Sequence, residues 1–74
     1  MATRRYNVML QPEVGGGSHA SCPVLPGCHS FGGTVEAALA NAKDAIEGYI
    51  ESLRKAGEPI PIDDLIIEHV EVTV

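Results

Sequence analysis

The chain has 74 residues and a mass of 7.8 kDa, which is enough for one small domain. Ten acidic residues against five basic ones give a formal net charge of −5 at pH 7, which argues against a nucleic-acid-binding protein. No apolar run approaches the roughly 20 residues that a membrane helix needs, and no leader-like apolar block follows Arg5. We therefore expect a cytoplasmic protein that does not span a membrane.

The first part of the chain predicts a short β-meander. Residues 6–11 alternate between apolar and polar side chains and are followed by Pro12, which indicates a strand. Three consecutive glycines at 15–17 favour a turn, after which residues 19–22 can return as a second strand. Prolines then mark a loop over residues 23–27, and residues 28–31 predict a third short strand.

The clearest predicted element is a helix of roughly 22 residues that begins after Thr34. Thr34 is a suitable N-cap, and apolar side chains recur at three- and four-residue spacing from Val35 to Leu53. Gly57 fits the left-handed position that follows a helix, and the prolines beyond it prevent continuation. Gly48 lies inside the helix, where a glycine predicts close packing against a neighbouring element.

Residues 65–74 predict a last strand, with Val70, Val72 and Val74 on one face. The expected fold is therefore α+β with the order β-β-β-α-β, an antiparallel meander that carries one long helix on one face. A single helix leaves the other face of the sheet uncovered. We therefore expect a homodimer or homotetramer that buries this face.

Potential metal ligands concentrate in one segment, which contains His19, Cys22, Cys28 and His29. Four such side chains could satisfy tetrahedral zinc, but their spacing matches none of the usual paired cysteine arrangements. Cys28 and His29 would also point to opposite sides of an extended segment. The two cysteines could instead form a disulfide, or they could be buried thiols beside surface histidines. We expect no metal and no cofactor, and these four residues are the weak candidates.

The sequence contains no recognisable catalytic constellation. A nucleophilic Cys28 would need a thiolate-stabilising environment and an orienting group, and the sequence indicates neither. Asp63 and Asp64 precede the last predicted strand, where a solvated turn is expected rather than an acid/base pair. We therefore predict that the protein is not an enzyme.

The segment from Pro23 to Ala38, which reads PVLPGCHSFGGTVEAA, resembles the HicB-like antitoxin family. The family pattern has a proline, then Leu-Pro-Gly-Cys, then Ser and Gly before a Thr, and a helix that begins with Glu and Ala. The similarity continues through residues 41–46 and the helix exit at 57–61, and it covers about residues 5 to 62. Val24 and Gly33 depart from the pattern, because the family often has acidic residues at these two positions.

This resemblance implies a partial RNase H-like fold with the element order expected above. It implies that residues 1–74 form a single HicB-like domain, and we expect no C-terminal DNA-binding module and no direct DNA binding. Such proteins sequester a small toxin ribonuclease (HicA-like) by protein–protein contact, so the expected partner is a small basic toxin ribonuclease. The alternative is an orphan HicB-like homo-oligomer with a structural or regulatory role and no toxin partner.

The expected partner-binding surface combines a loop, the strand that follows it and two acidic helix residues. Its members are Leu25, Pro26, Gly27, Cys28, His29, Ser30, Glu47 and Glu51. In the alternative interpretation, Leu25 caps the core, the next two residues form a tight turn, and the two glutamates belong to a solvated helix face.

Overall fold

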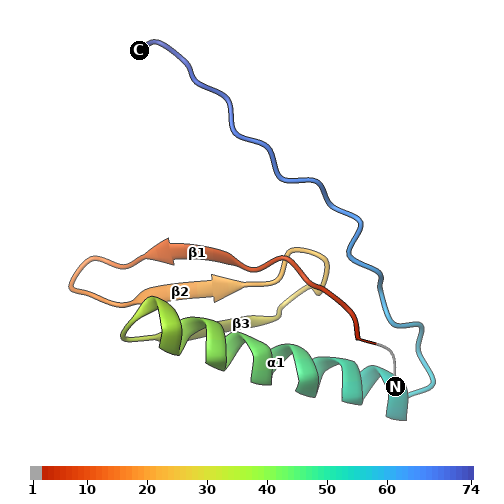
Figure 1. Cartoon of the computed structure of the whole chain (residues 1–74). Helices are drawn as coiled ribbons and strands as arrows, with labels where there is room; N and C mark the ends of the chain where they lie inside the picture. The colour runs from red at the N-terminus through yellow and green to blue at the C-terminus, as the bar shows by residue number, and fades with distance from the viewer. Residues whose placement is uncertain (1–2) are drawn as a thin grey trace.

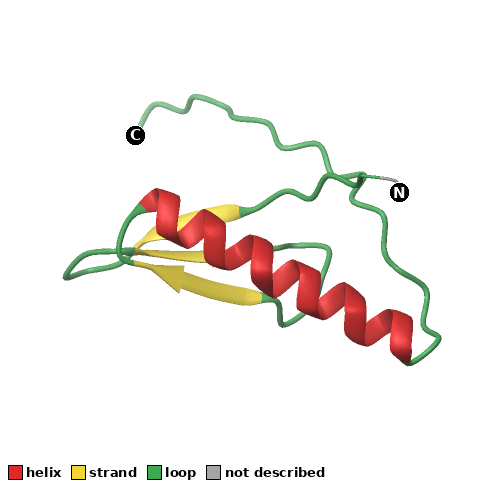
Figure 2. Cartoon of the chain, turned by 60° about the horizontal axis from the view of Figure 1, so that its bottom comes forward, coloured by secondary structure: helices red, strands yellow, loops and turns green. Residues whose placement is uncertain are grey.

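The computed structural model describes residues 3–74, which form a three-stranded sheet, one long helix and an extended C-terminal segment (Figure 1, Figure 2). The elements in chain order are β1 (Met9–Pro12), β2 (Ser18–Ser21), β3 (His29–Gly32) and α1 (Val35–Lys55). Both strand pairings are antiparallel, and the spatial order is β1-β2-β3. The predicted meander followed by one long helix is thus confirmed.

Two turns of different construction join the three strands. All three glycines between β1 and β2 have positive φ, a backbone conformation that L side chains rarely adopt. The N–H of Glu13 donates to the carbonyl of Gly17 over 3.0 Å and closes this turn. Between β2 and β3, the N–H of Cys22 donates to the carbonyl of Cys28 over 3.2 Å. This hydrogen bond extends the β2–β3 pairing to the base of the loop.

Helix α1 begins and ends as its sequence predicts. The hydroxyl of Thr34 accepts a hydrogen bond from the N–H of Ala37 at 3.1 Å, so the predicted N-cap is confirmed. After the helix, Gly57 has a φ of 71°, and its N–H donates to the carbonyl of Arg54. No helix within residues 3–74 has the length and apolarity needed to cross a bilayer.

The helix lies across β2 and β3, while all four residues of β1 are exposed. Small side chains from Ala20, Ala38 and Ala42 form the layer between helix and sheet. Gly32 marks the closest approach, because a methyl group there would collide with the backbone of Ala37 and Ala38. The helix can therefore rest on β3 only while this position has no side chain.

A second part of the core lies under the loop between β2 and β3. Leu25 is fully buried there and packs in one cluster with Cys22, Cys28 and Ile46. Partly buried apolar side chains surround this cluster, and they are Tyr6, Val8, Val24, Ala45, Tyr49 and Ile50. Leu25 is thus the large side chain around which this end of the domain packs.

Gly48 does not mark a close packing contact, and the sequence-based expectation is wrong. A methyl group at this exposed position would meet no heavy atom of the described residues within 4 Å. Replacing Gly48 by alanine is therefore expected to stabilise the helix by up to about 1 kcal/mol, because alanine has the higher helix propensity. Urea denaturation followed by circular dichroism would measure this gain. A lower denaturation midpoint would contradict the expectation.

The predicted last strand does not join the sheet, so the described residues have the order β-β-β-α. Residues 58–74 contain no helix or strand, and the segment leaves the body of the domain as an extended chain (Figure 1). The physical reason is that an alternating sequence specifies which face of a strand is apolar, whereas a strand forms only beside another strand. Residues 65–74, here called the tail, have no neighbouring strand in the described chain.

The chain just before the tail is held against the N-terminal segment. The hydroxyl of Tyr6 donates to the carbonyl of Pro61 over 2.7 Å. The backbone N–H and the side-chain amide of Asn7 both donate to the carboxylate of Asp63. The backbone N–H of Asn7 holds the pKa of the Asp63 carboxyl below its usual value, so this carboxylate is charged at neutral pH. The tail therefore starts from a defined point beside residues 6 and 7.

Candidate functional site

The loop expected to contact a partner is a compact turn fixed by its own backbone. The N–H of Leu25 donates to the carbonyl of Cys22 at 3.1 Å, and the N–H of Cys28 donates to the carbonyl of Leu25 at 3.0 Å. Leu25 and Cys28 are buried, whereas Pro26 and Gly27 are exposed at the tip. The structure therefore places two of the six expected loop and strand residues in the core, where they support the turn from beneath.

His29 and Ser30 continue from this loop into β3. His29 is exposed and Ser30 is half-buried, while the neighbouring Cys28 is buried. The expectation that Cys28 and His29 point to opposite sides is confirmed. The accessible part of the expected loop surface thus consists of Pro26, Gly27, His29 and, in part, Ser30.

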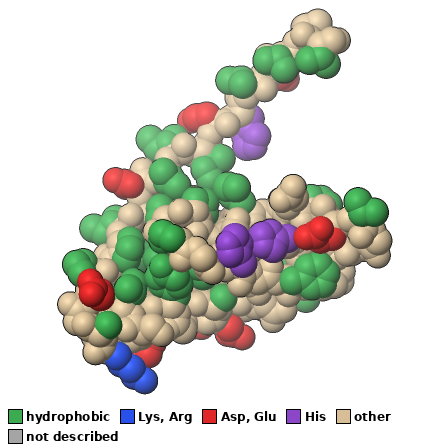
Figure 3. Space-filling view, turned by 180° about the vertical axis from the view of Figure 1, so that it is seen from behind, with side chains coloured by type: hydrophobic (Ala, Val, Ile, Leu, Met, Phe, Trp, Pro, Cys, Tyr) green, Lys and Arg blue, Asp and Glu red, His purple; other side chains and the backbone are tan. Residues whose placement is uncertain are grey.

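Two histidines meet on the sheet face opposite α1. His29 Nδ1 lies 3.1 Å from His19 Nε2, and the two rings stack with centroids 5.0 Å apart. Figure 3 shows these two adjacent histidine side chains on the surface, and Phe31 and Met9 on the same sheet are about half exposed. The strand register places all four residues on one face. No element within residues 3–74 covers this face, as one helix per sheet implies.

The cysteines do not join the histidines in one cluster. Cys22 and Cys28 are free thiols in the core, and burial raises the pKa of each above its usual value. His19 and His29 lie instead on the open face. Across residues 3–74, no group of three or more histidine, cysteine or acidic side chains is placed to hold a metal ion. At neutral pH these cysteines are therefore protonated core side chains.

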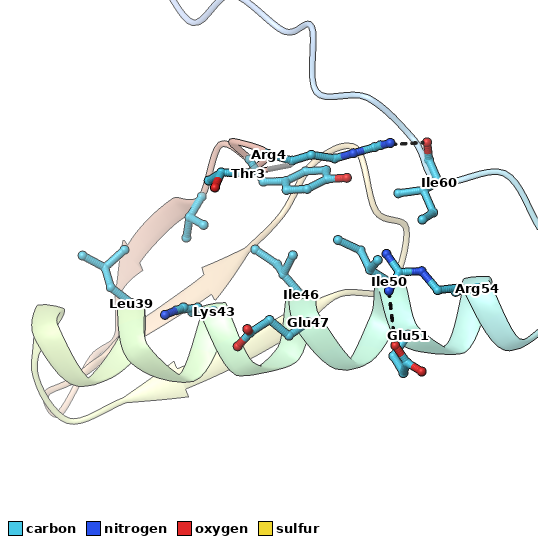
Figure 4. A pocket seen from close by; sticks show the side chains of 12 residues that line it. Thr3, Arg4, Leu39, Lys43, Ile46, Glu47, Ile50, Glu51, Arg54 and Ile60 are labelled. Carbon is cyan, nitrogen blue, oxygen red and sulfur yellow. Dashed lines mark hydrogen bonds and ion pairs between the residues drawn. The ribbon is translucent and has the colours of Figure 1, made fainter. Parts of the chain in front are cut away.

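The structure also contains a groove that the sequence did not predict. It lies between α1 and the N-terminal segment, and its volume is about 660 Å³ (Figure 4). Apolar side chains line it, and they are Tyr6, Val8, Leu39, Ile46, Ile50 and Ile60. Charged side chains lie along its rim, and they are Arg4, Lys43, Glu47, Glu51 and Arg54. The sequence signal for this groove is the apolar stripe of α1, which is broader than the surface that contacts β2 and β3.

The two expected acidic residues belong to this groove. Glu47 and Glu51 line its rim, and the described lining includes none of residues 25–30. The carboxylate of Glu51 lies 3.6 Å from the guanidinium of Arg54 in an exposed ion pair, which contributes little stability. The loop surface and the acidic helix residues are therefore two separate features of the domain.

Comparison with known proteins finds a family and relatives that match most of this chain. The family described as HicB-like antitoxin of bacterial toxin-antitoxin systems matches residues 6–73. A UPF0150 protein of Synechocystis sp. is 49% identical over 69 residues, which cover 93% of this chain and 87% of that protein. A UPF0150 protein of Thermoplasma acidophilum is 43% identical over 60 residues, with 81% and 87% covered. A 14.9 kDa protein of Haemophilus phage HP1 is 36% identical over 65 residues, which cover 88% of this chain and 48% of that protein. This chain therefore belongs to the HicB-like antitoxin family.

Proposed function

We propose that this protein binds a small basic toxin ribonuclease (HicA-like) and blocks it by protein–protein contact. Membership of an antitoxin family implies a toxin partner in general. The net charge of −5 is complementary to the basic surface that a ribonuclease needs for RNA. Opposite charges accelerate the encounter of two proteins and disfavour acidic competitors.

The fixed loop between β2 and β3 carries this proposal. Three backbone hydrogen bonds hold residues 22–28 in one conformation, and its tip, Pro26 and Gly27, is exposed. A surface that is already ordered loses little conformational entropy on binding. His29 and Ser30 extend the accessible surface along β3. In this proposal Leu25 and Cys28 position the loop and do not touch the toxin.

The two glutamates on α1 have a different role in this proposal. Both are exposed on the groove rim, which includes none of residues 25–30. In this proposal they attract the basic toxin through their charge and do not contact it. Replacing Glu47 and Glu51 together by glutamine is expected to slow association and reduce its salt dependence, with little effect on dissociation.

Affinity purification of the tagged chain from its native host, followed by mass spectrometry, tests the partner. The expected result is a small basic protein in stoichiometric amount whose RNA cleavage stops when this chain is added. The double variant P26A/H29A is expected to weaken that complex at least about tenfold, because it removes the exposed side chains of the loop surface.

Val14→Ala is the matched control, because Val14 is fully exposed in the first turn. It should leave toxin binding unchanged. Recovery of this chain alone would contradict toxin sequestration. A toxin complex that is insensitive to P26A/H29A would place the contact elsewhere on the domain.

A second candidate function is that of an orphan homo-oligomer with a structural or regulatory role. The open sheet face and the unpaired tail favour it, because both leave apolar side chains exposed. Recovery of this chain alone as a stable oligomer would support this role.

A further inference from the structure

The tail exposes an unusual amount of apolar surface for so small a domain. Its large aliphatic side chains are all exposed, and they are Leu65 (46%), Ile66 (83%), Ile67 (49%), Val70 (86%), Val72 (75%) and Val74 (115%). The radius of gyration is 14.2 Å, whereas a compact domain of this length has about 11 Å. The tail thus extends outward, although burying its apolar side chains away from water would lower the free energy.

The tail is also a strand without a partner. Val70, Val72 and Val74 alternate with His69, Glu71 and Thr73, so one face is apolar and the other polar. In the part of the chain that the structure describes, no backbone hydrogen bond joins residues 66–74 to another segment. The backbone N–H and C=O groups of residues 66–74 are consequently available to a neighbouring strand.

Strand β1 provides a free edge of the same kind. The Glu13–Gly17 hydrogen bond and the register of Gln11 opposite His19 direct the N–H and C=O of Leu10 away from β2. The corresponding edge of β3 is partly occupied, because the side-chain amide of Asn41 donates to the carbonyl of Phe31 over 2.7 Å. Among the described residues, the edge of β1 is therefore the less occupied of the two.

The groove between α1 and the segment that leads into β1 has an apolar lining that another chain could cover. Leu39, Ile46 and Ile50 line it from the side of α1 (Figure 4), Val8 also belongs to its lining, and the residues of β1 are exposed. A strand added at the β1 edge would place every second side chain on the face of the sheet that carries α1, the same side as this groove. Val70, Val72 and Val74, here called the valine face of the tail, are apolar like the groove lining and lie at the two-residue spacing of a strand.

We propose that the tail of one copy pairs as a strand with β1 of a second copy and covers its groove with the valine face. The chain's own tail leaves the body after its root beside Tyr6 and Asn7 (Figure 1), so this place is open to the tail of another copy. Each copy offers one tail and one free edge, so reciprocal exchange satisfies both in a closed twofold dimer. This dimer does not depend on a toxin.

The mass of the full chain in solution tests this exchange. Size-exclusion chromatography with light scattering should give twice the monomer mass for the wild type. Two adjacent residues of a strand direct their N–H groups to opposite sides, so one of Glu71→Pro and Val72→Pro removes a donor that pairs with β1. At least one of these variants should therefore have half the wild-type mass, while its helical circular dichroism is retained.

Glu71→Gln and Val72→Ile are the matched controls, since both keep the backbone N–H and should remain dimeric. A monomeric wild type would overturn the proposal, and so would proline variants that both stay dimeric. An alternative dimer would pack two copies through the open sheet face that carries Phe31. Phe31→Lys should break that dimer and leave the dimer formed by tail exchange intact. The toxin-binding assay is a separate measurement, so the failure of either proposal is recognised independently of the other.

Isotope-filtered NMR on a mixture of labelled and unlabelled chains identifies which copy covers the groove. Cross-peaks between valine methyl groups of the tail in one copy and Leu39, Ile46 or Ile50 of the other are expected. A dimer whose tail cross-peaks all arise within one copy would overturn the exchange.

Discussion

Replacing Gly32 by alanine is expected to destabilise the domain by about 3 kcal/mol or more. The added methyl group would overlap the backbone of Ala37 and Ala38, at the point where α1 crosses the end of β3. Backbone atoms cannot rotate away as a flexible side chain can, so the helix would have to lift off the sheet. Urea denaturation followed by circular dichroism would show an early transition or no folded baseline.

The adjacent glycine provides the control for this prediction. A methyl group at Gly33 would meet no heavy atom within 4 Å, and this residue has no positive φ. Gly33→Ala should therefore change stability by no more than about 0.5 kcal/mol. Equal effects of the two substitutions would show that lost chain flexibility, and not the helix contact, accounts for the result.

Leu25→Ala is expected to destabilise the domain by about 2–5 kcal/mol, because it removes a fully buried side chain and leaves a cavity. A single core in a domain of this size rarely supplies more than about 3–5 kcal/mol. The variant should therefore be largely unfolded at room temperature. Thermal denaturation would measure this loss, and Val14→Ala should melt as the wild type does.

The same substitution separates the two interpretations of Leu25. Leu25→Met keeps the volume of the side chain and should retain both the fold and any toxin binding. If Leu25→Ala remained fully stable and lost only toxin binding, Leu25 would be a direct contact residue. That outcome would contradict its position in the core.

The confirmed parts of the fold are those that rest on local signals. The Thr34 cap, the Gly57 exit and the glycine turn at 15–17 act within a few residues, and each lies where the sequence predicts it. The alternation that separates Cys28 from His29 is equally local. These features need no knowledge of the rest of the molecule, which is why a single sequence is sufficient for them.

The features that sequence reasoning missed depend on distant contacts. Whether a glycine permits close packing depends on where the helix crosses the sheet. The sequence predicts a close contact at Gly48, whereas the structure has it at Gly32. The contact between His19 and His29 needs the register of β2 against β3. The tail has a clear strand pattern, but no pattern within one chain specifies the strand that it pairs with.

The buried residues of this domain have a consequence for its synthesis. All of them lie between Ser18 and Ile46, and the partly buried Tyr6, Val8, Tyr49 and Ile50 pack against them. Chains are made at about 5–20 residues per second. Residues 65–74 are therefore added about 1–6 s after Ile46. Pairing of the tail with a second copy joins two chains, so it is a later step whose rate depends on protein concentration.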